Sequence, residues 1–178
     1  MIRPALIVAT CALFALPSFA ADPSPALKRG EQLVLTHGCH DCHTPFKMGP
    51  KGPEPDMAVM LSGHPEKLVM PPPPPLNDAW NFVGSATNTA YAGPWGITYA
   101  FNLTPDPVTG LGKWREQDFV KAINTGKHLG VGREIMPPMP WPWYRYLSDA
   151  DLKLIFAYLK TIPPIRNKVP DYQPPKPR

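Results

Sequence analysis

The spacing of apolar and polar residues predicts three helices, and the last of them is the most clearly marked. It begins after Ser148, a residue type that suits the N-cap, and it ends before the prolines at 163 and 164. Apolar residues recur at helical spacing along one side of it, namely Leu152, Ile155, Phe156 and Leu159. This stripe predicts a helix that packs against the core of the protein.

Two other segments carry weaker helical signals. A first helix is expected from Ser24 and Pro25, which suit the N-cap and the first turn, to just before Gly38. Within it, Gly30 either lets another helix approach closely or is simply tolerated. A second helix is expected over residues 114–125, ended by Gly126. We therefore predict an all-α fold.

Residues 44–94 do not fit this helical pattern. The chain has 27 prolines, and five in a row occupy residues 71–75. At about 3.1 Å per residue, this run is expected to form a polyproline II segment of roughly 15 Å. A free linker is one interpretation, but the Met, Trp, Phe and Tyr residues of the segment favour a loop packed on the core. We expect a proline-rich insert of irregular structure at about residues 46–92.

Residues 1–20 have the pattern of a secretory signal. Arg3 precedes an apolar run, and Ser18 and Ala20 are small residues at the positions that a signal peptidase reads. Cleavage after Ala20 is expected to leave one domain at residues 21–168, followed by a proline-rich basic tail at residues 169–178. The apolar run is short for a membrane span, so an uncleaved anchor is the alternative. The signal predicts export to the periplasm.

The composition limits the number of domains, the size of the core and the class of partner. Removal of residues 1–20 leaves about 158 residues, the size of one domain, and lowers the formal net charge from +4 to +3. The hydrophobic content of 43% supports one modest core. The basic residues are scattered singly, which excludes nucleic acid as an expected partner.

The sequence CHDCH at residues 39–43 is the attachment signature of c-type haem. Each thiol adds to one vinyl group of the porphyrin, so Cys39 and Cys42, one turn apart, are expected to hold a single haem covalently. The next residue, His43, then falls under the iron, where its imidazole can serve as an axial ligand. Thioether attachment takes place outside the cytoplasm, in agreement with the predicted signal.

Three other roles for the two cysteines are less consistent with the sequence. A dithiol redox pair normally opens a helix after a strand, whereas the upstream stretch here is predicted to be helical. A zinc site needs four separated ligands, and the mature chain has no second cysteine pair. A structural disulfide would leave His43 without a role.

The second axial ligand is expected to be a methionine on the opposite face of the haem. Met48 lies too close to His43 in the sequence, because the five residues that lead to it span at most roughly 17 Å and cannot pass around the edge of the haem to its other face. The other methionines that can reach are Met57, Met60, Met70, Met136 and Met139. Residues 135–143 are stiffened by prolines, which favours Met136 and Met139, because a weak thioether ligand must be held in place. Packing of these methionines on tryptophans is the alternative.

The attachment motif, a Met-Pro element and a closing helix with AYL at residues 157–159 resemble class I cytochrome c. The second half also resembles the cytochrome c subunits of bacterial periplasmic and membrane-bound dehydrogenases. The segments that carry this likeness are NLTPD at 102–106, TGLGKW at 109–114, DF at 118–119, TGKH at 125–128 and MPW at 139–141. The likeness covers roughly residues 26–47 and 93–168, and the insert departs from it.

The resemblance implies roles for individual residues. The methionine that opens the Met-Pro-aromatic segment maps onto Met139, which makes Met136 the second choice for the iron. Asn102 and Thr104 fall in a loop that lies near the haem propionates in this family. His64 and His128 are weaker alternatives as iron ligands, since loop histidines are more often solvated or hydrogen-bonded.

The resulting prediction is a periplasmic electron carrier with one covalent haem c, and not an enzyme. The resemblance implies a periplasmic dehydrogenase as electron donor and an oxidase or another cytochrome as acceptor. No membrane span is expected after signal cleavage. The alternative is a haem enzyme or gas-binding protein that leaves one iron position open.

Overall fold

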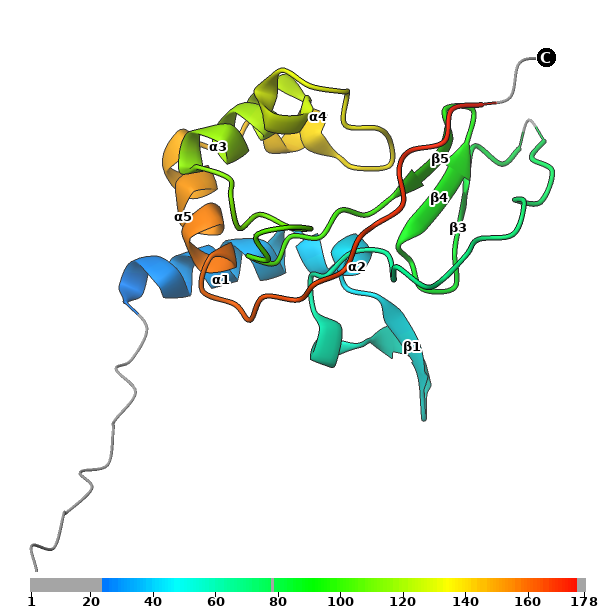
Figure 1. Cartoon of the computed structure of the whole chain (residues 1–178), viewed down its shortest axis with the longest axis horizontal. Coiled ribbons are helices and arrows are strands. Elements are labelled where there is room, and N and C mark those ends of the chain that lie inside the picture. The colour runs from blue at the N-terminus through cyan, green and yellow to red at the C-terminus, as the bar shows by residue number, and fades with distance from the viewer. Residues whose placement is uncertain (1–23, 78, 176–178) are drawn as a thin grey trace, which may run out of the picture.

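The computed structural model of the chain describes residues 24–77 and 79–175 (Figure 1). The predicted signal at residues 1–20 therefore lies outside the described residues. Within them, no helix combines the length and apolar character that a membrane crossing requires.

The three predicted helices are confirmed as α1 (Pro25–Thr36), α3 (Glu116–Thr125) and α5 (Asp149–Leu159). Ser24 caps α1 by accepting a hydrogen bond from the Leu27 amide, and Ser148 caps α5 in the same way. Their apolar faces form one core, whose buried residues include Leu33, Val34, Leu111, Phe119, Val120, Ile123, Leu152, Ile155, Phe156 and Leu159.

Helices α1 and α5 touch at Gly30. A Cβ atom placed on Gly30 would overlap the backbone carbonyl of Leu154 in α5. Of the two interpretations of this glycine, close approach of a second helix is therefore the correct one.

Within the described segments, four shorter helices connect these elements. The attachment motif forms α2 (Cys39–His43), which follows Gly38 at a φ of 65°. This left-handed glycine turns the chain between α1 and α2. The others are η1 (Met57–Val59), η2 (His128–Gly130) and α4 (Trp141–Tyr144).

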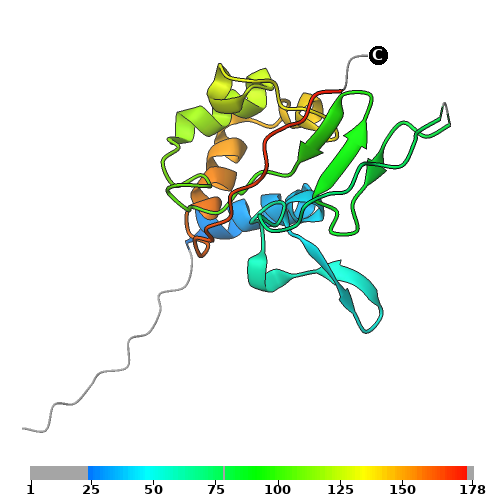
Figure 2. The same ribbon diagram turned by 45° about the vertical axis from the view of Figure 1, so that its right-hand side comes forward.

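The prediction of an all-α fold is wrong. Helices hold 32% of the described residues and strands 14%, and the strands form two antiparallel sheets. The first pairs β1 (Phe46–Gly49) with β2 (Gly52–Pro55), and this hairpin projects from the body in Figure 2. The second has the order β3 (Val83–Gly84), β4 (Ala90–Gly93) and β5 (Gly96–Tyr99). The insert is thus not simply irregular.

The spacing of apolar residues did not predict these sheets, because the strands are short and the segment is rich in proline. No strand exceeds four residues in the described segments, too few to show a convincing alternation. The turns, however, carry a signal. Residues 49–52 read GPKG and residues 93–96 read GPWG, with Gly52 at a φ of 120° and Gly96 at 98°. Proline at the second and glycine at the fourth position favour a tight turn, so both hairpins were visible in principle.

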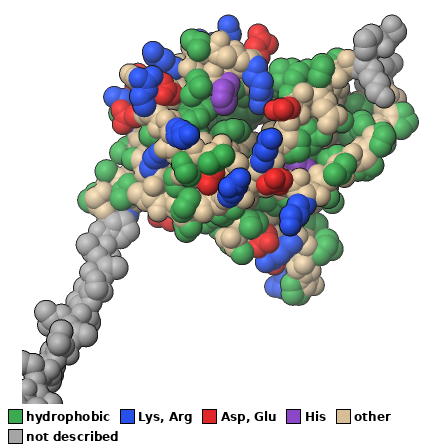
Figure 3. Space-filling model, in the orientation of Figure 1, with side chains coloured by type: hydrophobic (Ala, Val, Ile, Leu, Met, Phe, Trp, Pro, Cys, Tyr) green, Lys and Arg blue, Asp and Glu red, His purple; other side chains and the backbone are tan. Residues whose placement is uncertain are grey.

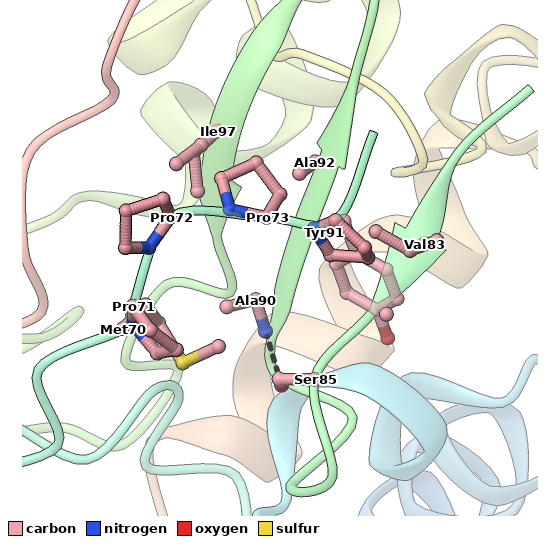
Figure 4. A pocket seen from close by; sticks show the side chains of 12 residues that line it. Met70, Pro71, Pro72, Pro73, Val83, Ser85, Ala90, Tyr91, Ala92 and Ile97 are labelled. Carbon is pink, nitrogen blue, oxygen red and sulfur yellow. Dashed lines mark hydrogen bonds between the residues drawn. The ribbon is translucent and has the colours of Figure 1, made fainter. Parts of the chain in front are cut away.

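The proline run covers the outer face of the second sheet. Figure 4 shows Pro72 and Pro73 crossing in front of β4, near Ala90 and Ala92. Only a small cavity of about 90 Å³ remains between the run and the sheet. The run thus lies against this sheet rather than on the helical core, and its five prolines are exposed, as are Met57 and Trp80, which had favoured packing. The sheet turns its other face inward.

The C-terminal segment returns across the molecule from α5 to β5, as Figures 1 and 2 show. Gln173 pairs with Ile97 of β5 through two backbone hydrogen bonds. Asn167 is buried, and its side-chain amide donates to the carbonyls of Ser62 and His64. Up to residue 175, the C-terminal segment is therefore tied to the insert.

Candidate haem site

A cavity of about 940 Å³ lies between the helical core and the second sheet. Its walls come from α2, β4, β5, α3, the loop before α4, α5 and the C-terminal segment. Apolar side chains dominate the wall near α3 and α5, including Leu103, Leu111, Phe119, Ile123, Leu152, Ile155 and Leu159. The volume lies at the upper end of the range for ligand sites.

Both cysteines of the attachment motif line this cavity and are free rather than joined in a disulfide. The single turn of α2 places them on the same side. Burial raises the pKa of the Cys39 thiol to about 12 and also raises the pKa of Cys42. Both side chains are therefore neutral thiols directed at an apolar space.

His43 is oriented for ligation by its own hydrogen bond. It is 8% exposed, and its Nδ1 lies 2.7 Å from the carbonyl oxygen of Phe101. A carbonyl only accepts, so Nδ1 carries the proton and Nε2 keeps a free lone pair. Burial lowers the pKa of His43, which favours the neutral imidazole that a metal ion binds.

Two methionines from a distant segment line the same cavity. Met136 and Met139 follow α3 in the chain and precede α4, and Met139 also packs against the helical core. Among the described residues, no other methionine borders the cavity. Met48 and Met57 are largely exposed, whereas Met70 borders the small cavity behind β4.

Asn102 and Thr104 lie behind the wall rather than on it. Both are fully buried, and neither borders the cavity. Asn102 donates to the carbonyl of Ile165 at 2.8 Å and accepts from the Thr104 hydroxyl at 2.7 Å. Their side chains therefore fix the C-terminal segment, and propionate contact stays a prediction.

The two alternative histidine ligands differ in position. His64 is fully buried, and its ring nitrogens lie 2.9 Å from the Thr89 hydroxyl and 2.9 Å from the Leu68 carbonyl. Both nitrogens are thus engaged away from the cavity. His128 does border the cavity, where its ring meets Trp114 edge-on at 5.0 Å.

Sequence reasoning missed several residues of the wall. Three cationic side chains border the cavity, namely Arg133, Arg166 and Lys168. Tyr91 and Thr98 also border it, from the second sheet. Two basic residues at 166 and 168, close together after the prolines that end α5, were the available signal. Nothing local marked Tyr91 or Thr98, because their strands are too short to show an alternating pattern.

These residues fit a covalent haem. The cavity joins two free thiols one turn apart, a histidine with an open Nε2 and two thioethers, within apolar walls. Cationic side chains on the same wall can pair with carboxylates. The donor set is that of a c-type haem site.

Comparison with known proteins agrees with this chemistry. The family model described as cytochrome c matches residues 27–163. The chain is 36% identical over 157 residues to a nicotinate dehydrogenase subunit from Pseudomonas putida, covering 88% of the chain and 10% of that protein. It is 30% identical over 154 residues to the gluconate 2-dehydrogenase cytochrome c subunit of Pantoea cypripedii, covering 86% and 27% respectively.

A third relative is the cytochrome c subunit of alcohol dehydrogenase (quinone) from Gluconobacter oxydans, which is 30% identical over 156 residues. That match covers 85% of the chain and 25% of the relative. The chain thus spans about a tenth to about a quarter of the length of these relatives. Because the family model covers most of the chain, and the site has the matching donors, the chain belongs to the cytochrome c family, with the haem c and electron-transfer role that this family implies.

Proposed function

We propose that this protein is a periplasmic electron carrier with one covalent haem, ligated by His43 and Met139. The observation that carries the proposal is the shared cavity, which brings the attachment motif and a methionine pair from the far end of the chain together. A bound haem supplies a one-electron Fe(III)/Fe(II) couple. With His43 and Met139 both holding the iron, no position would be left for a substrate.

The protein's own residues bind, orient and shield the group. Cys39 and Cys42 hold the ring, and the Phe101 carbonyl fixes the imidazole of His43. Apolar side chains of α3 and α5, which line the cavity, would exclude water from the iron. A rigid, dry site that changes little between redox states suits transfer of electrons rather than chemistry on a substrate.

Met139 is proposed over Met136 for two reasons. It opens the Met-Pro-aromatic segment that the family resemblance points to. It also packs against the helical core, which limits its freedom and suits a weak thioether ligand. Met136 borders the same cavity and remains the second choice.

For the haem carboxylates we propose an indirect role for Asn102 and Thr104. Both bond to the carbonyl of Ile165, the residue before Arg166. Arg166 borders the cavity, so the buried pair can hold this guanidinium in place for a propionate. The predicted loop thus acts through the C-terminal segment.

The proposed electron donor is a periplasmic dehydrogenase, and the proposed acceptor is an oxidase or another cytochrome. The names of the gluconate and alcohol dehydrogenase subunits support the choice of donor. Lys and Arg are interspersed with Asp and Glu over the face shown in Figure 3, without one dominant sign. Such a surface suits brief docking, which an electron carrier needs for turnover.

Mass spectrometry and a visible spectrum of the exported protein test the proposal. We expect the added mass of one porphyrin and, in the ferric state, the weak red-edge band of a methionine-ligated haem. Met139→Ala should lose this band and Met136→Ala should keep it. Carbon monoxide binding by the untreated ferrous protein would instead favour a haem enzyme or gas-binding protein.

A further inference from the structure

The segment that carries both methionines, residues 136–139, has little hydrogen bonding of its own. Prolines at 137, 138 and 140 lack an N–H group. Among the described residues, one side-chain hydrogen bond reaches residues 136–139, from the Thr98 hydroxyl to the Pro137 carbonyl at 2.7 Å. We call this segment the methionine loop.

Thr98 lies on the face of the second sheet that borders the cavity. It is 8% exposed and stands opposite Tyr91 in the β4–β5 pair. Residues opposite each other in an antiparallel pair share a face, and both side chains border the haem cavity. The neighbouring Ile97 points to the other face, toward the proline run (Figure 4).

The same sheet is also tied to the attachment motif. The Tyr91 hydroxyl lies 3.1 Å from Cys42 Sγ, which is a thiol here and would be a thioether in the haem-bound protein. Asn88, in the turn before β4, donates from Nδ2 to the Asp41 carbonyl at 2.7 Å. Asn88 has a φ of 53°, a conformation that asparagine tolerates better than most residues.

We propose that Thr98 is a positioning residue that holds the methionine loop at a set distance from the attachment motif. The second sheet connects the two: Asn88 and Tyr91 contact the attachment motif, and Thr98, opposite Tyr91 in β5, contacts the loop. This inference rests on the proposed function, because it assumes that a methionine of the loop binds the iron. It gives a role to β3–β5, for which the family resemblance offered none.

The physical reason is the weakness of the thioether bond. A methionine ligand competes with other ligands, and its advantage depends on the loop being held near the iron before it binds. Loss of the Thr98 hydroxyl removes this part-buried hydrogen bond to the Pro137 carbonyl and frees the loop. A hydrogen bond of this kind corresponds to roughly a tenfold change in an equilibrium constant.

Imidazole displacement in the haem-loaded, full-length protein tests this role. Imidazole is titrated into the ferric protein while the red-edge band of methionine ligation is followed. We expect Thr98→Val to bind imidazole about tenfold more tightly than the wild type, since valine keeps the shape but not the donor. Thr98→Ser is the matched control and should restore the wild-type affinity.

A second readout is the reduction potential, which should fall in Thr98→Val and not in Thr98→Ser, because weaker methionine ligation favours the ferric state. Equal imidazole affinities in the two variants would overturn the inference. If Thr98→Val does not accumulate with haem, Thr98→Ala carries the same expectation. Failure of the proposed ligation looks different: the wild type itself would lack the band, and neither Met136→Ala nor Met139→Ala would alter its spectrum.

Discussion

The helical core and the second sheet are held together by different forces. Helices α1, α3 and α5 meet through buried aliphatic and aromatic side chains, with polar groups mainly at their caps. The sheet, its connections and the C-terminal segment instead meet through buried polar side chains. These include His64, Thr89, Thr98, Asn102, Thr104 and Asn167, all of which are hydrogen-bonded.

This difference explains why one region was predictable and the other was not. Apolar packing repeats with the period of the helix and can be seen in the sequence. A buried polar contact depends on partners far along the chain. Asn167, for example, donates hydrogen bonds to residues more than 100 positions away, and no local sequence pattern predicts such contacts.

The largest effect is expected in the helical core. Leu159 is 1% exposed within α5, so Leu159→Ala should lower the free energy of unfolding by about 3 kcal/mol through lost burial and a cavity. Urea denaturation followed by circular dichroism measures this. Leu35→Ala, at a leucine 57% exposed in α1, should stay within about 0.5 kcal/mol.

The next largest loss of stability is expected at Asn167, whose polar contacts join the C-terminal segment to the insert. Asn167→Ala leaves the carbonyls of Ser62 and His64 and the amide of Glu66 without their partner. We expect a loss of about 2 kcal/mol in the same urea experiment, because unpaired buried polar groups are costly. Asn81→Ala, at an exposed position, is the control. A loss no larger than that of Asn81→Ala would show that the polar contacts of Asn167 are dispensable.

At Asn88, in the turn before β4, the contribution of side-chain hydrogen bonding to stability can be separated from that of the positive φ. Asn88→Ala loses the bond to the Asp41 carbonyl and puts alanine at a positive φ, so about 2 kcal/mol of stability should be lost. Asn88→Gly loses the same side-chain bonds, to the Asp41 carbonyl and from the Tyr91 hydroxyl, but tolerates the positive φ, so it should cost about 1 kcal/mol. Equal losses in thermal or urea unfolding would mean that the backbone conformation contributes nothing.

The smallest effect is expected where the C-terminal segment meets β5. Tyr172 donates its hydroxyl to the Trp95 carbonyl at 2.5 Å, so Tyr172→Phe should cost about 0.5 to 1 kcal/mol. Hydrogen exchange should also speed up at the Ile97 amide, which pairs with Gln173. Tyr146→Phe, at a tyrosine 79% exposed, should change neither quantity.

In the candidate site, as in the fold, some residues could be predicted from the sequence and others could not. Five consecutive residues, CHDCH, contain the complete chemistry of haem attachment, so the sequence alone identified Cys39, Cys42 and His43 as candidates. The choice among the methionines needed family resemblance, and it remains a proposal for Met139. The cations at 133, 166 and 168, and the sheet residues Tyr91 and Thr98, emerged only from the structure.

The sequence by itself determined the three helices, their caps and the identity of the cofactor chemistry, because each depends on residues within a turn or two of one another. The tertiary structure alone decided that the second sheet faces the cavity, that the C-terminal segment joins this sheet and that one wall of the cavity is built from both. Those outcomes depend on hydrogen bonds between residues 39 to more than 100 positions apart, such as Thr98 with Pro137 and Asn167 with Ser62. Contacts at such separations leave no period in the chain, and only the folded backbone brings their partners together.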